Sequence, residues 1–247
     1  MNHIIVEGHR GYCAKYPENT LISYNAAIDL GVDAFEFDIW LSKDKVPVIS
    51  HDDKPTRTTG TERFLRDMTL SEIKELDAGA LFDSKFIGER VPTLKETLDL
   101  VKNKRPDMWL GVEIKECTEE TVDIAVAMLK EYGFFERCWF YCFNARIIKY
   151  LKKKYNARTM GYPDFQMSEF EEDSYVYYDE IGLSMNLLRS EIFPIYLAKG
   201  LPMHMFCADT TKDVALAAEK GASLITANNP VPLLKYLGRW DEKNGKN

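Results

Sequence analysis

The chain has 247 residues, of which 45% are hydrophobic, so it is long and apolar enough to bury one large core. Its formal net charge of −7, from 32 Lys and Arg against 39 Asp and Glu, argues against broad electrostatic binding of nucleic acid or of acidic membranes. No apolar stretch approaches the roughly 20 residues of a membrane span, and the N-terminal apolar run is too short for a secretory segment, so we expect a soluble, unprocessed protein.

Short apolar runs alternate with amphipathic segments along the chain, which predicts strands and helices in turn. We expect strands at residues 4–6, 34–39, 109–114, 138–143, 158–161, 181–185, 203–207 and 223–225. We expect helices at residues 20–30, 94–102, 119–132, 145–154, 190–199, 211–220 and 231–237. The repeated order predicts a parallel sheet, and the length suits one α/β domain, a TIM (β/α)8 barrel over residues 1–240 followed by a polar tail at 241–247.

The connection between the second strand and the helix at 94 is much longer than the others, so we assign an insertion to about residues 43–92. It contains a charged turn at 43–45, an alternating run at 46–50 and a short helix at 70–76. Thr69 with Glu72, and Thr93 with Glu96, match the capping box, in which side chains satisfy free amides at a helix start. If the run at 46–50 folds back antiparallel on 39–42, the turn brings His51 beside the second strand.

Acidic side chains recur on two of the predicted strands. Because residues i and i+2 of a strand share a face, Glu36 and Asp38 project together, and Glu113 and Lys115 do likewise. Solvation on an edge strand is the alternative, but apolar neighbours indicate burial, and an unpaired buried charge is costly. Three hard oxygen ligands without a nearby thiol favour Mg²⁺ or Ca²⁺ over zinc. We therefore expect Glu36, Asp38 and Glu113 to bind one divalent cation, Mg²⁺ or Ca²⁺.

Two of the four histidines stand next to predicted strands. His9 lies just past the first strand, in a turn whose glycines allow close approach of a ligand, and His51 ends the folded-back run. Each alone is more often a packing or surface residue than a catalyst. Together with the acids they suit phosphodiester cleavage, because one imidazole can accept a proton from the nucleophile while the other donates one to the leaving alkoxide.

Two strong cations, Arg10 and Lys115, accompany these groups. Arg can hold nonbridging phosphate oxygens through a planar fork and Lys as a point charge. The alternative for each is a salt bridge to Glu18 or Glu36. The combination of acids, imidazoles and cations therefore predicts a metal-assisted site for cleaving phosphate esters.

These residues resemble the motifs of the glycerophosphodiester phosphodiesterases. The resemblance rests on ordered motifs in the first half of the chain: His9-Arg10-Gly11, Pro17-Glu18-Asn19-Thr20, Gly31-Val32-Asp33, Glu36-Phe37-Asp38, Lys43-Asp44-Lys45-Val46-Pro47-Val48, His51-Asp52, Arg57-Thr58-Thr59-Gly60, Val91-Pro92-Thr93-Leu94 and Glu113-Ile114-Lys115. It implies a TIM barrel with a small insertion after the second strand. By this resemblance the metal-binding acids are Glu36, Asp38 and Glu113, the acid/base histidines are His9 and His51, and the phosphate-side cations are Arg10 and Lys115.

The second half resembles the family less closely. Where the family usually has Ser-Phe, Trp-Thr-Val-Asn and Thr-Asp-x-Pro, this chain has Cys142-Phe143-Asn144, Phe206-Cys207-Ala208-Asp209 and Ala227-Asn228-Asn229-Pro230. These positions are expected to line the alcohol side of the pocket, and we assign Phe143 and Phe206 to substrate binding. With Trp40 and Tyr162 they could form an apolar wall for a head group such as choline, through cation-π contacts, the alternative being plain packing at the barrel mouth.

The leading hypothesis is a metal-dependent phosphodiesterase that hydrolyses glycerophosphodiesters to glycerol 3-phosphate and an alcohol by histidine acid/base catalysis. One alternative is phosphodiesterase action on lysophospholipids or phosphoinositides, which needs a longer apolar groove that no exposed hydrophobic helix obviously provides. The other is a catalytically silent barrel that binds a phosphoryl ligand. The expected partner is the small-molecule substrate, without nucleic acid or stable membrane insertion, and the oligomeric state stays open.

The remaining histidines and cysteines carry less information. His3 and His204 have no role that the sequence assigns. The five cysteines include no Cys-x-x-Cys pair, which indicates neither a disulfide framework nor a zinc knuckle. Reduced thiols in a cytoplasmic protein are the simpler interpretation.

Overall fold

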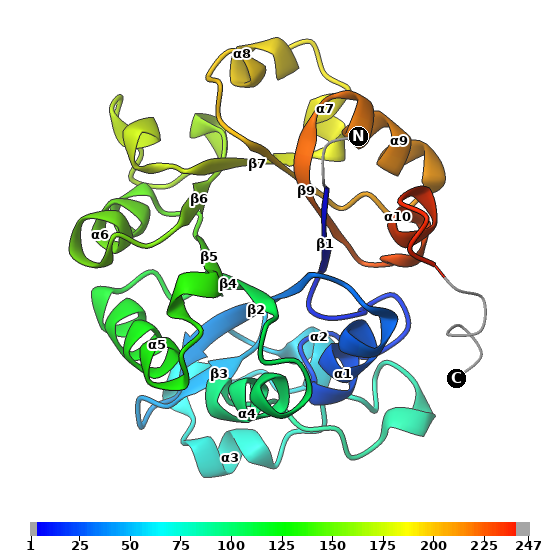
Figure 1. The fold of residues 1–247 in the computed structure, drawn as a ribbon. Coiled ribbons are helices and arrows are strands. Elements are labelled where there is room, and N and C mark those ends of the chain that lie inside the picture. Colours follow the sequence, from blue (N-terminus) through cyan, green and yellow to red (C-terminus); the bar gives the residue numbers. More distant parts are fainter. Residues whose placement is uncertain (1–3, 241–247) are drawn as a thin grey trace.

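Residues 4–240, the part of the chain that the computed structural model describes, contain eight parallel strands closed into a barrel with helices around it (Figure 1). The barrel strands are β1 (Ile5–Gly8), β2 (Ala34–Leu41), β4 (Trp109–Ile114), β5 (Cys138–Tyr141), β6 (Thr159–Gly161), β7 (Glu180–Ser184), β8 (Met203–Phe206) and β9 (Ala222–Ala227). Each pairs in parallel with its neighbours, and β1 pairs with both β9 and β2, which closes the ring. The predicted TIM barrel is confirmed, while the predicted tail at 241–247 lies outside the described residues.

Helices cover the outside of the barrel. They are α1 (Leu21–Leu30), α4 (Leu94–Lys104), α5 (Glu119–Tyr132), α6 (Ala145–Tyr155), α7 (Met185–Leu188), α8 (Phe193–Leu197), α9 (Thr211–Glu219) and α10 (Val231–Tyr236). Thr93 and Glu96 form the capping box predicted for α4, and Gly133, at a left-handed φ of 79°, ends α5. Single 3₁₀ turns connect other elements: η1 (Leu65–Asp67), η2 (Ser84–Phe86), η3 (Phe135–Arg137), η4 (Asp164–Gln166) and η5 (Ser174–Tyr177).

The predicted helix at 190–199 is wrong in its extent. Only the short helix α8, whose first turn contains Pro194, lies in this segment, and the separate helix α7, capped by Ser184, precedes it. Proline has no backbone N–H and its ring clashes with the carbonyl four residues earlier, so a helix that starts at 190 cannot run through position 194 undisturbed. Proline is compatible with the first turn of α8, where the amide would have no intrahelical partner.

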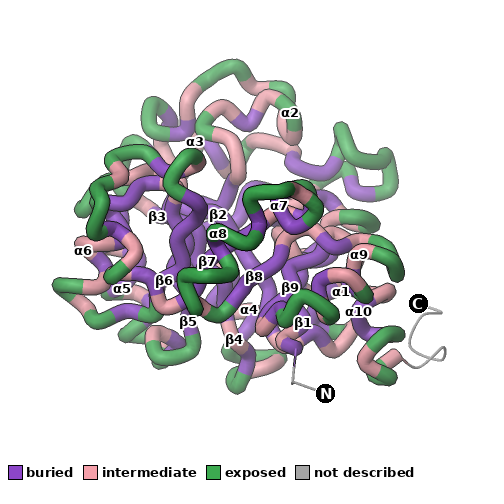
Figure 2. Tube along the Cα trace, turned by 90° about the horizontal axis from the view of Figure 1, so that it is seen from above, coloured by how far each residue is buried: buried purple, intermediate pink, exposed green. Residues whose placement is uncertain are grey.

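The connection between β2 and α4 forms a separate layer above one end of the barrel, where α2 (Thr56–Thr59) and α3 (Leu70–Lys74) lie in Figure 2. It begins with β3 (Pro47–Ile49), which pairs antiparallel with β2 in the register Ile39 to Ile49 and Leu41 to Pro47. A second, small apolar core holds this layer together: Val48, Leu65, Met68, Ile73, Ala78 and Val91. The predicted hairpin is therefore confirmed, and the Ser50 amide donates to the Asp38 carbonyl at 3.0 Å, which places His51 next to β2.

Candidate active site

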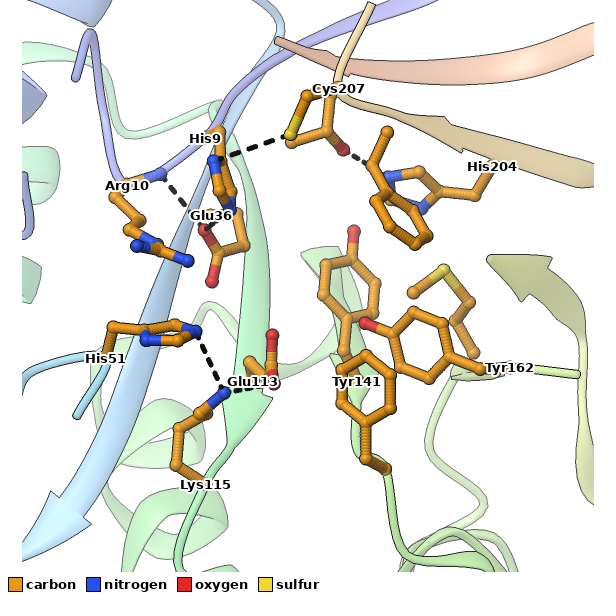
Figure 3. Close-up of a pocket in the computed structure, with 14 residues that line it drawn as sticks. His9, Arg10, Glu36, His51, Glu113, Lys115, Tyr141, Tyr162, His204 and Cys207 are labelled. Carbon is orange, nitrogen blue, oxygen red and sulfur yellow. Dashed lines mark hydrogen bonds and ion pairs between the residues drawn. The ribbon is translucent and has the colours of Figure 1, made fainter. Parts of the chain in front are cut away.

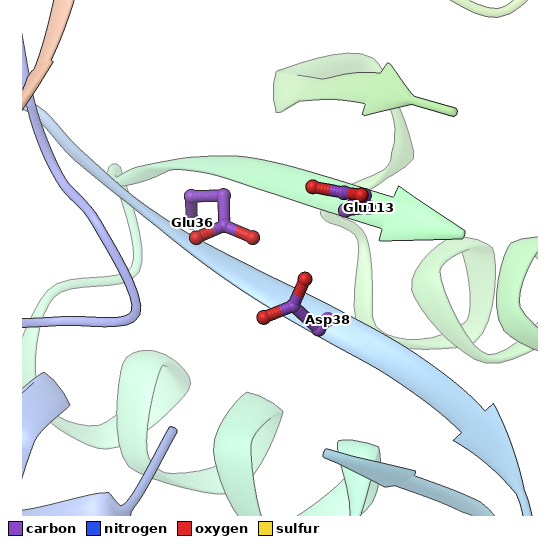
Figure 4. A group of neighbouring side chains, drawn as sticks. All are labelled: Glu36, Asp38 and Glu113. Atoms are coloured by element: carbon purple, nitrogen blue, oxygen red, sulfur yellow. The ribbon is translucent and has the colours of Figure 1, made fainter. Parts of the chain in front are cut away.

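The three predicted acids lie together on the adjacent strands β2 and β4 (Figure 4). Strand β2 turns its aromatic side chains outward, where Tyr24 of α1 stacks on Phe35 at 4.4 Å, so the alternate residues Glu36 and Asp38 face inward. Asp38 is the register partner of Glu113 on β4. All three side chains are buried, and one carboxylate oxygen from each lies within 4.8 Å of the others. The three acids therefore converge from two neighbouring strands, as expected.

The electrostatics of this acid cluster (Glu36, Asp38 and Glu113) fit a hard cation. Burial, followed by the charges of Asp38 and Glu113, raises the pKa of Glu36 well above its ordinary value. Burial and Glu113 likewise raise the pKa of Asp38. Glu36 Oε1 and Asp38 Oδ1 are buried without a hydrogen-bond partner, although buried carboxylate oxygens are normally satisfied. Unsatisfied hard oxygens in a cluster of this kind are the ligand set that Mg²⁺ and Ca²⁺ prefer.

His9 follows β1 and is oriented by a chain of hydrogen bonds. Its Nδ1 lies 2.6 Å from Asn228 Oδ1, and Asn228 Nδ2 donates to Asp209 Oδ2 at 2.6 Å. Because the amide nitrogen is engaged by Asp209, the amide oxygen accepts the Nδ1 proton of His9, and the other ring nitrogen, Nε2, lies 4.0 Å from Glu36. Burial and the neighbouring Arg10 charge lower the pKa of His9, so the neutral ring with a free Nε2 lone pair is favoured.

His51 follows β3 and lies next to Lys115. Its Nδ1 lies 2.8 Å from Asp52 Oδ1, and Arg57 donates to the other oxygen of Asp52 at 2.9 Å. Its Nε2 lies 3.3 Å from Lys115 Nζ. An ammonium can only donate, so in this arrangement Nε2 accepts from Lys115 and the proton of the neutral ring is on Nδ1, toward Asp52.

Both predicted cations lie in the site, and both are already paired. Arg10 donates to Glu18 Oε1 at 2.8 Å, as the salt-bridge alternative for this residue expected, and its Nε lies 3.5 Å from Asp38. Lys115 donates to Glu113 Oε1 at 3.0 Å. Glu18 also accepts two hydrogen bonds from Arg57, so one acid holds two guanidinium groups at the rim of the acid cluster.

The pocket above the acid cluster has a volume of about 230 Å³ and two unlike halves. Charged groups lie on one side and aromatic rings on the other (Figure 3). Phe143 stacks on Tyr162 at 3.7 Å, and Phe206 meets Tyr162 edge-on at 5.8 Å. Trp40 is not part of this wall among the described residues, because it packs against the small core of the insertion and its indole donates to the His51 carbonyl. Three of the four predicted aromatic residues therefore line the pocket.

The floor of the pocket holds polar residues to which the sequence assigned no role. Glu7 is fully buried and accepts hydrogen bonds from Tyr141 Oη at 2.9 Å and Thr226 Oγ1 at 2.6 Å, while His204 contacts both Thr226 and Glu7. The sequence offers one hint of this role, an acid within an apolar strand directly before Gly8. The partners of Glu7 could not be predicted, because they lie on three strands that are distant in the sequence. Asn19, by contrast, belongs to the Pro17-Glu18-Asn19-Thr20 motif of the sequence analysis, and its amide donates to Asp38 Oδ2 at 2.7 Å.

Apolar side chains are exposed on the segment that follows Tyr162. Ile195 and Leu197 of α8 are 58% and 48% exposed, and Phe165 of η4 is 63% exposed. Tyr196 joins the two elements by donating to Asp164 at 2.8 Å. These side chains form a short exposed apolar surface on α8 and η4. No helix within residues 4–240 is long and apolar enough to cross a membrane.

Comparisons with known proteins agree with the motifs. The model of the glycerophosphoryl diester phosphodiesterase family matches residues 9–227. A glycerophosphodiester phosphodiesterase of Caldanaerobacter subterraneus is 41% identical over 155 residues, which cover 60% of this chain and 62% of that protein. A Bacillus subtilis protein of the same name is 35% identical over 130 residues, which cover 46% and 44% of the two chains. The matched stretches thus span less than two thirds of these relatives.

Solved structures match over nearly the whole chain. A phosphodiesterase of Oleispira antarctica, solved in complex with the product sn-glycerol-3-phosphate, superposes with a TM-score of 0.84 at 24% identity and covers 95% of this chain and 96% of its own. A glycerophosphodiester phosphodiesterase of Agrobacterium tumefaciens gives a TM-score of 0.78 at 24% identity, over 94% of this chain and 100% of its own. At this level of identity the likeness supports the barrel fold.

Proposed function

Because this chain belongs to the glycerophosphoryl diester phosphodiesterase family, we propose that it hydrolyses glycerophosphodiesters to glycerol 3-phosphate and an alcohol. One observation carries the proposal: three buried carboxylates, two of them with an unsatisfied oxygen, cluster at a pocket that two histidines and two cations also line. A barrel that needed these residues only for folding would have no reason to hold so many charges at one end. The Oleispira antarctica phosphodiesterase, solved in complex with the product sn-glycerol-3-phosphate, has the same fold.

We propose that Glu36, Asp38 and Glu113 hold one divalent cation, Mg²⁺ or Ca²⁺. When bound, such an ion supplies Lewis-acid stabilisation of charge on a phosphoryl oxygen. Arg10 and Lys115 then act on the remaining nonbridging oxygens, after exchanging part of their contacts with Glu18 and Glu113 for contacts with phosphate. Phe143 and Phe206 line the apolar half of the pocket and contact the organic part of the substrate.

His9 and His51 act as the acid/base pair. The free Nε2 lone pair that burial favours on His9 accepts the proton of the attacking hydroxyl. His51, oriented by Asp52, donates to the leaving alkoxide a proton that its Nε2 takes up once Lys115 has left it for the phosphate, and the two histidines exchange roles in a second step. Attack by a neighbouring glycerol hydroxyl gives a cyclic phosphate before water opens it, whereas attack by water gives the product directly. Detection of the cyclic phosphate by phosphorus NMR distinguishes the two routes.

A coupled assay for glycerol 3-phosphate release tests this function across several head groups, with Mg²⁺ or Ca²⁺ and with chelator. We expect release that the chelator abolishes and that Glu36→Gln removes, while Glu136→Gln, at an exposed position far from the pocket, leaves the rate unchanged. Binding of a glycerophosphodiester without release, under every metal condition, would instead identify a silent barrel.

A second candidate is a phosphodiester substrate with one acyl chain. The exposed apolar residues Phe165, Ile195 and Leu197 lie on elements that follow Tyr162, and they provide a surface along which such a chain could lie. The comparison of glycerophosphocholine with a lysophospholipid in the same assay separates the candidates. A higher kcat/KM for the lysolipid, lowered selectively by Ile195→Ser, would favour the acyl substrate.

We further propose a cytoplasmic location. All five cysteines are free thiols in the structure, as is usual for a reducing compartment. Cell fractionation with a tagged chain tests this, and recovery of the protein outside the cytoplasm would contradict it.

A further inference from the structure

Two cysteines lie side by side behind the wall of the pocket. Cys117 belongs to the loop between β4 and α5, and Cys142 directly follows β5. Their sulfur atoms are 3.6 Å apart, and Cys142 also donates to the Ile114 carbonyl at 3.2 Å. The two residues come from neighbouring barrel strands, so the fold itself holds the thiols together.

The two thiols differ in the way that a reactive pair requires. Cys142 is fully buried, whereas Cys117 is partly exposed and can be reached from solvent. The contact with Cys142 lowers the pKa of Cys117 against the effect of burial, while burial raises the pKa of Cys142. Redox-active pairs commonly combine an accessible thiol of lowered pKa with a resolving thiol beside it. Within residues 4–240, this is the only pair of cysteines whose sulfur atoms are joined by a hydrogen bond.

We propose that Cys117 and Cys142 form a modification site that peroxides oxidise reversibly to a disulfide. The Cys117 thiolate attacks one oxygen of hydrogen peroxide, the O–O bond breaks, and a sulfenic acid and hydroxide form. The Cys142 sulfur then attacks the sulfenic sulfur, the S–O bond breaks, and water leaves with the proton of Cys142. In total two thiols and one peroxide give one disulfide and two waters, so two electrons pass from the thiols to the peroxide. An external dithiol reverses the reaction by exchange.

Closure of this bond acts on two residues of the pocket. Lys115 lies two residues before Cys117, and Phe143 directly follows Cys142, with Lys115 Nζ 5.9 Å from the Phe143 ring. The sulfurs must approach from 3.6 Å to about 2.05 Å, so the two side chains and the segments that carry them must rearrange. A shift of about 1 Å at a positioning group can cost about 100-fold in rate, so the disulfide form is the less active one. This consequence for activity rests on the proposed function, whereas formation of the disulfide does not.

Treatment of the intact protein with hydrogen peroxide, followed by peptide mapping without reductant, tests the proposal. We expect a linked pair of peptides that contain Cys117 and Cys142, a turnover lower by about tenfold or more, and recovery of both with dithiothreitol. Cys117→Ser replaces the thiol with a hydroxyl at a partly exposed position, so the variant is expected to fold and to keep its basal turnover. It should form no such link. Cys138→Ser is the control, because that thiol is buried away from the other cysteines' hydrogen bonds and donates to the Phe134 carbonyl.

The outcomes are distinct. No link between the two peptides at peroxide concentrations that oxidise Cys117 to higher acids would overturn the site, whatever the activity does. A link that forms without any change in turnover would overturn its effect on the pocket. Equal peroxide sensitivity of the wild-type and Cys117→Ser proteins would assign the loss of turnover to another group, such as Cys207 next to His9. A failure of the proposed function would leave the peptide map unchanged and remove only the turnover readout.

Discussion

Replacement of Glu36 by Gln is expected to stabilise the metal-free protein and to abolish its stabilisation by a divalent cation. The amide is close in shape to the carboxylate and can still accept the hydrogen bond from the Arg10 amide, which is 3.0 Å from Glu36 Oε2. The change therefore removes charge while it keeps packing. The variant therefore distinguishes two explanations of the acid cluster. If the cluster serves metal binding, loss of one charge stabilises the metal-free protein, whereas if it serves stability, loss of one charge does not.

The size of the effect follows from the spacing of the acid cluster. Two ionised carboxylates 4.8 Å apart repel by about 3 kcal/mol at an effective dielectric constant near 20. The wild type avoids part of this repulsion by binding a proton, and the positive charges of Arg10 and Lys115 offset another part. We therefore expect the free energy of unfolding of the variant to rise by about 1–3 kcal/mol. For a chain of this length that gain corresponds to a rise in Tm of about 2–12 °C. A cation at a hundredfold excess over its Kd is worth about 3 kcal/mol to the wild type by mass action.

Thermal unfolding measures both effects, with chelator and with Mg²⁺ or Ca²⁺, across pH. An acid whose pKa is raised in the folded state destabilises that state once pH exceeds the ordinary value of 4.5, so the advantage of Glu36→Gln should be absent below about pH 4 and grow as pH rises. Exposed Glu136→Gln should show neither effect. A lower Tm for Glu36→Gln in chelator, or a wild-type Tm that no divalent cation raises, would refute the reasoning.

Three further changes test other parts of the site. His51→Ala should lower turnover by about 10² to 10⁴, the usual range for a lost acid/base group, and an unchanged kcat would remove His51 from the chemistry. Burial alone would raise the pKa of Glu18, but Arg57 and Arg10 hold it at about 2 against 4.5, so this acid contributes about 3 kcal/mol that is present above pH 4.5 and lost toward pH 2. Urea unfolding of Glu18→Gln should show that deficit at neutral pH and none near pH 2, and a deficit independent of pH would count against the ion pairs. Gly111→Ala would press a methyl group against Glu7 and Tyr141, so its Tm should fall by about 2–12 °C, and a Tm equal to that of the wild type would show that the floor can relax.

The sequence predicted those parts of the site that depend on local rules. Period-two alternation placed Glu36 and Asp38 on one face, and turn chemistry brought His51 back to β2, because both depend on neighbours in the chain. The Asn228 contact that orients His9 and the Glu7 contacts beneath the pocket depend on which strands meet across the closed barrel. No periodicity within a segment encodes those contacts. The extent of α8 was mispredicted because helical pattern was given more weight than Pro194.

The barrel and its insertion make different contributions to the site. Parallel strands deliver the acid cluster, His9 and Lys115 to one end of the barrel, because every strand of a TIM barrel runs in the same direction. The antiparallel strand β3 delivers His51 from the layer built on top, together with Asp52 and Arg57, which hold its orientation. Arg57 also donates hydrogen bonds to Glu18, the acid that pairs with Arg10. The insertion therefore supplies one of the two histidines proposed as the acid/base pair, and the carboxylate of Glu18 links Arg57, which holds Asp52, to Arg10.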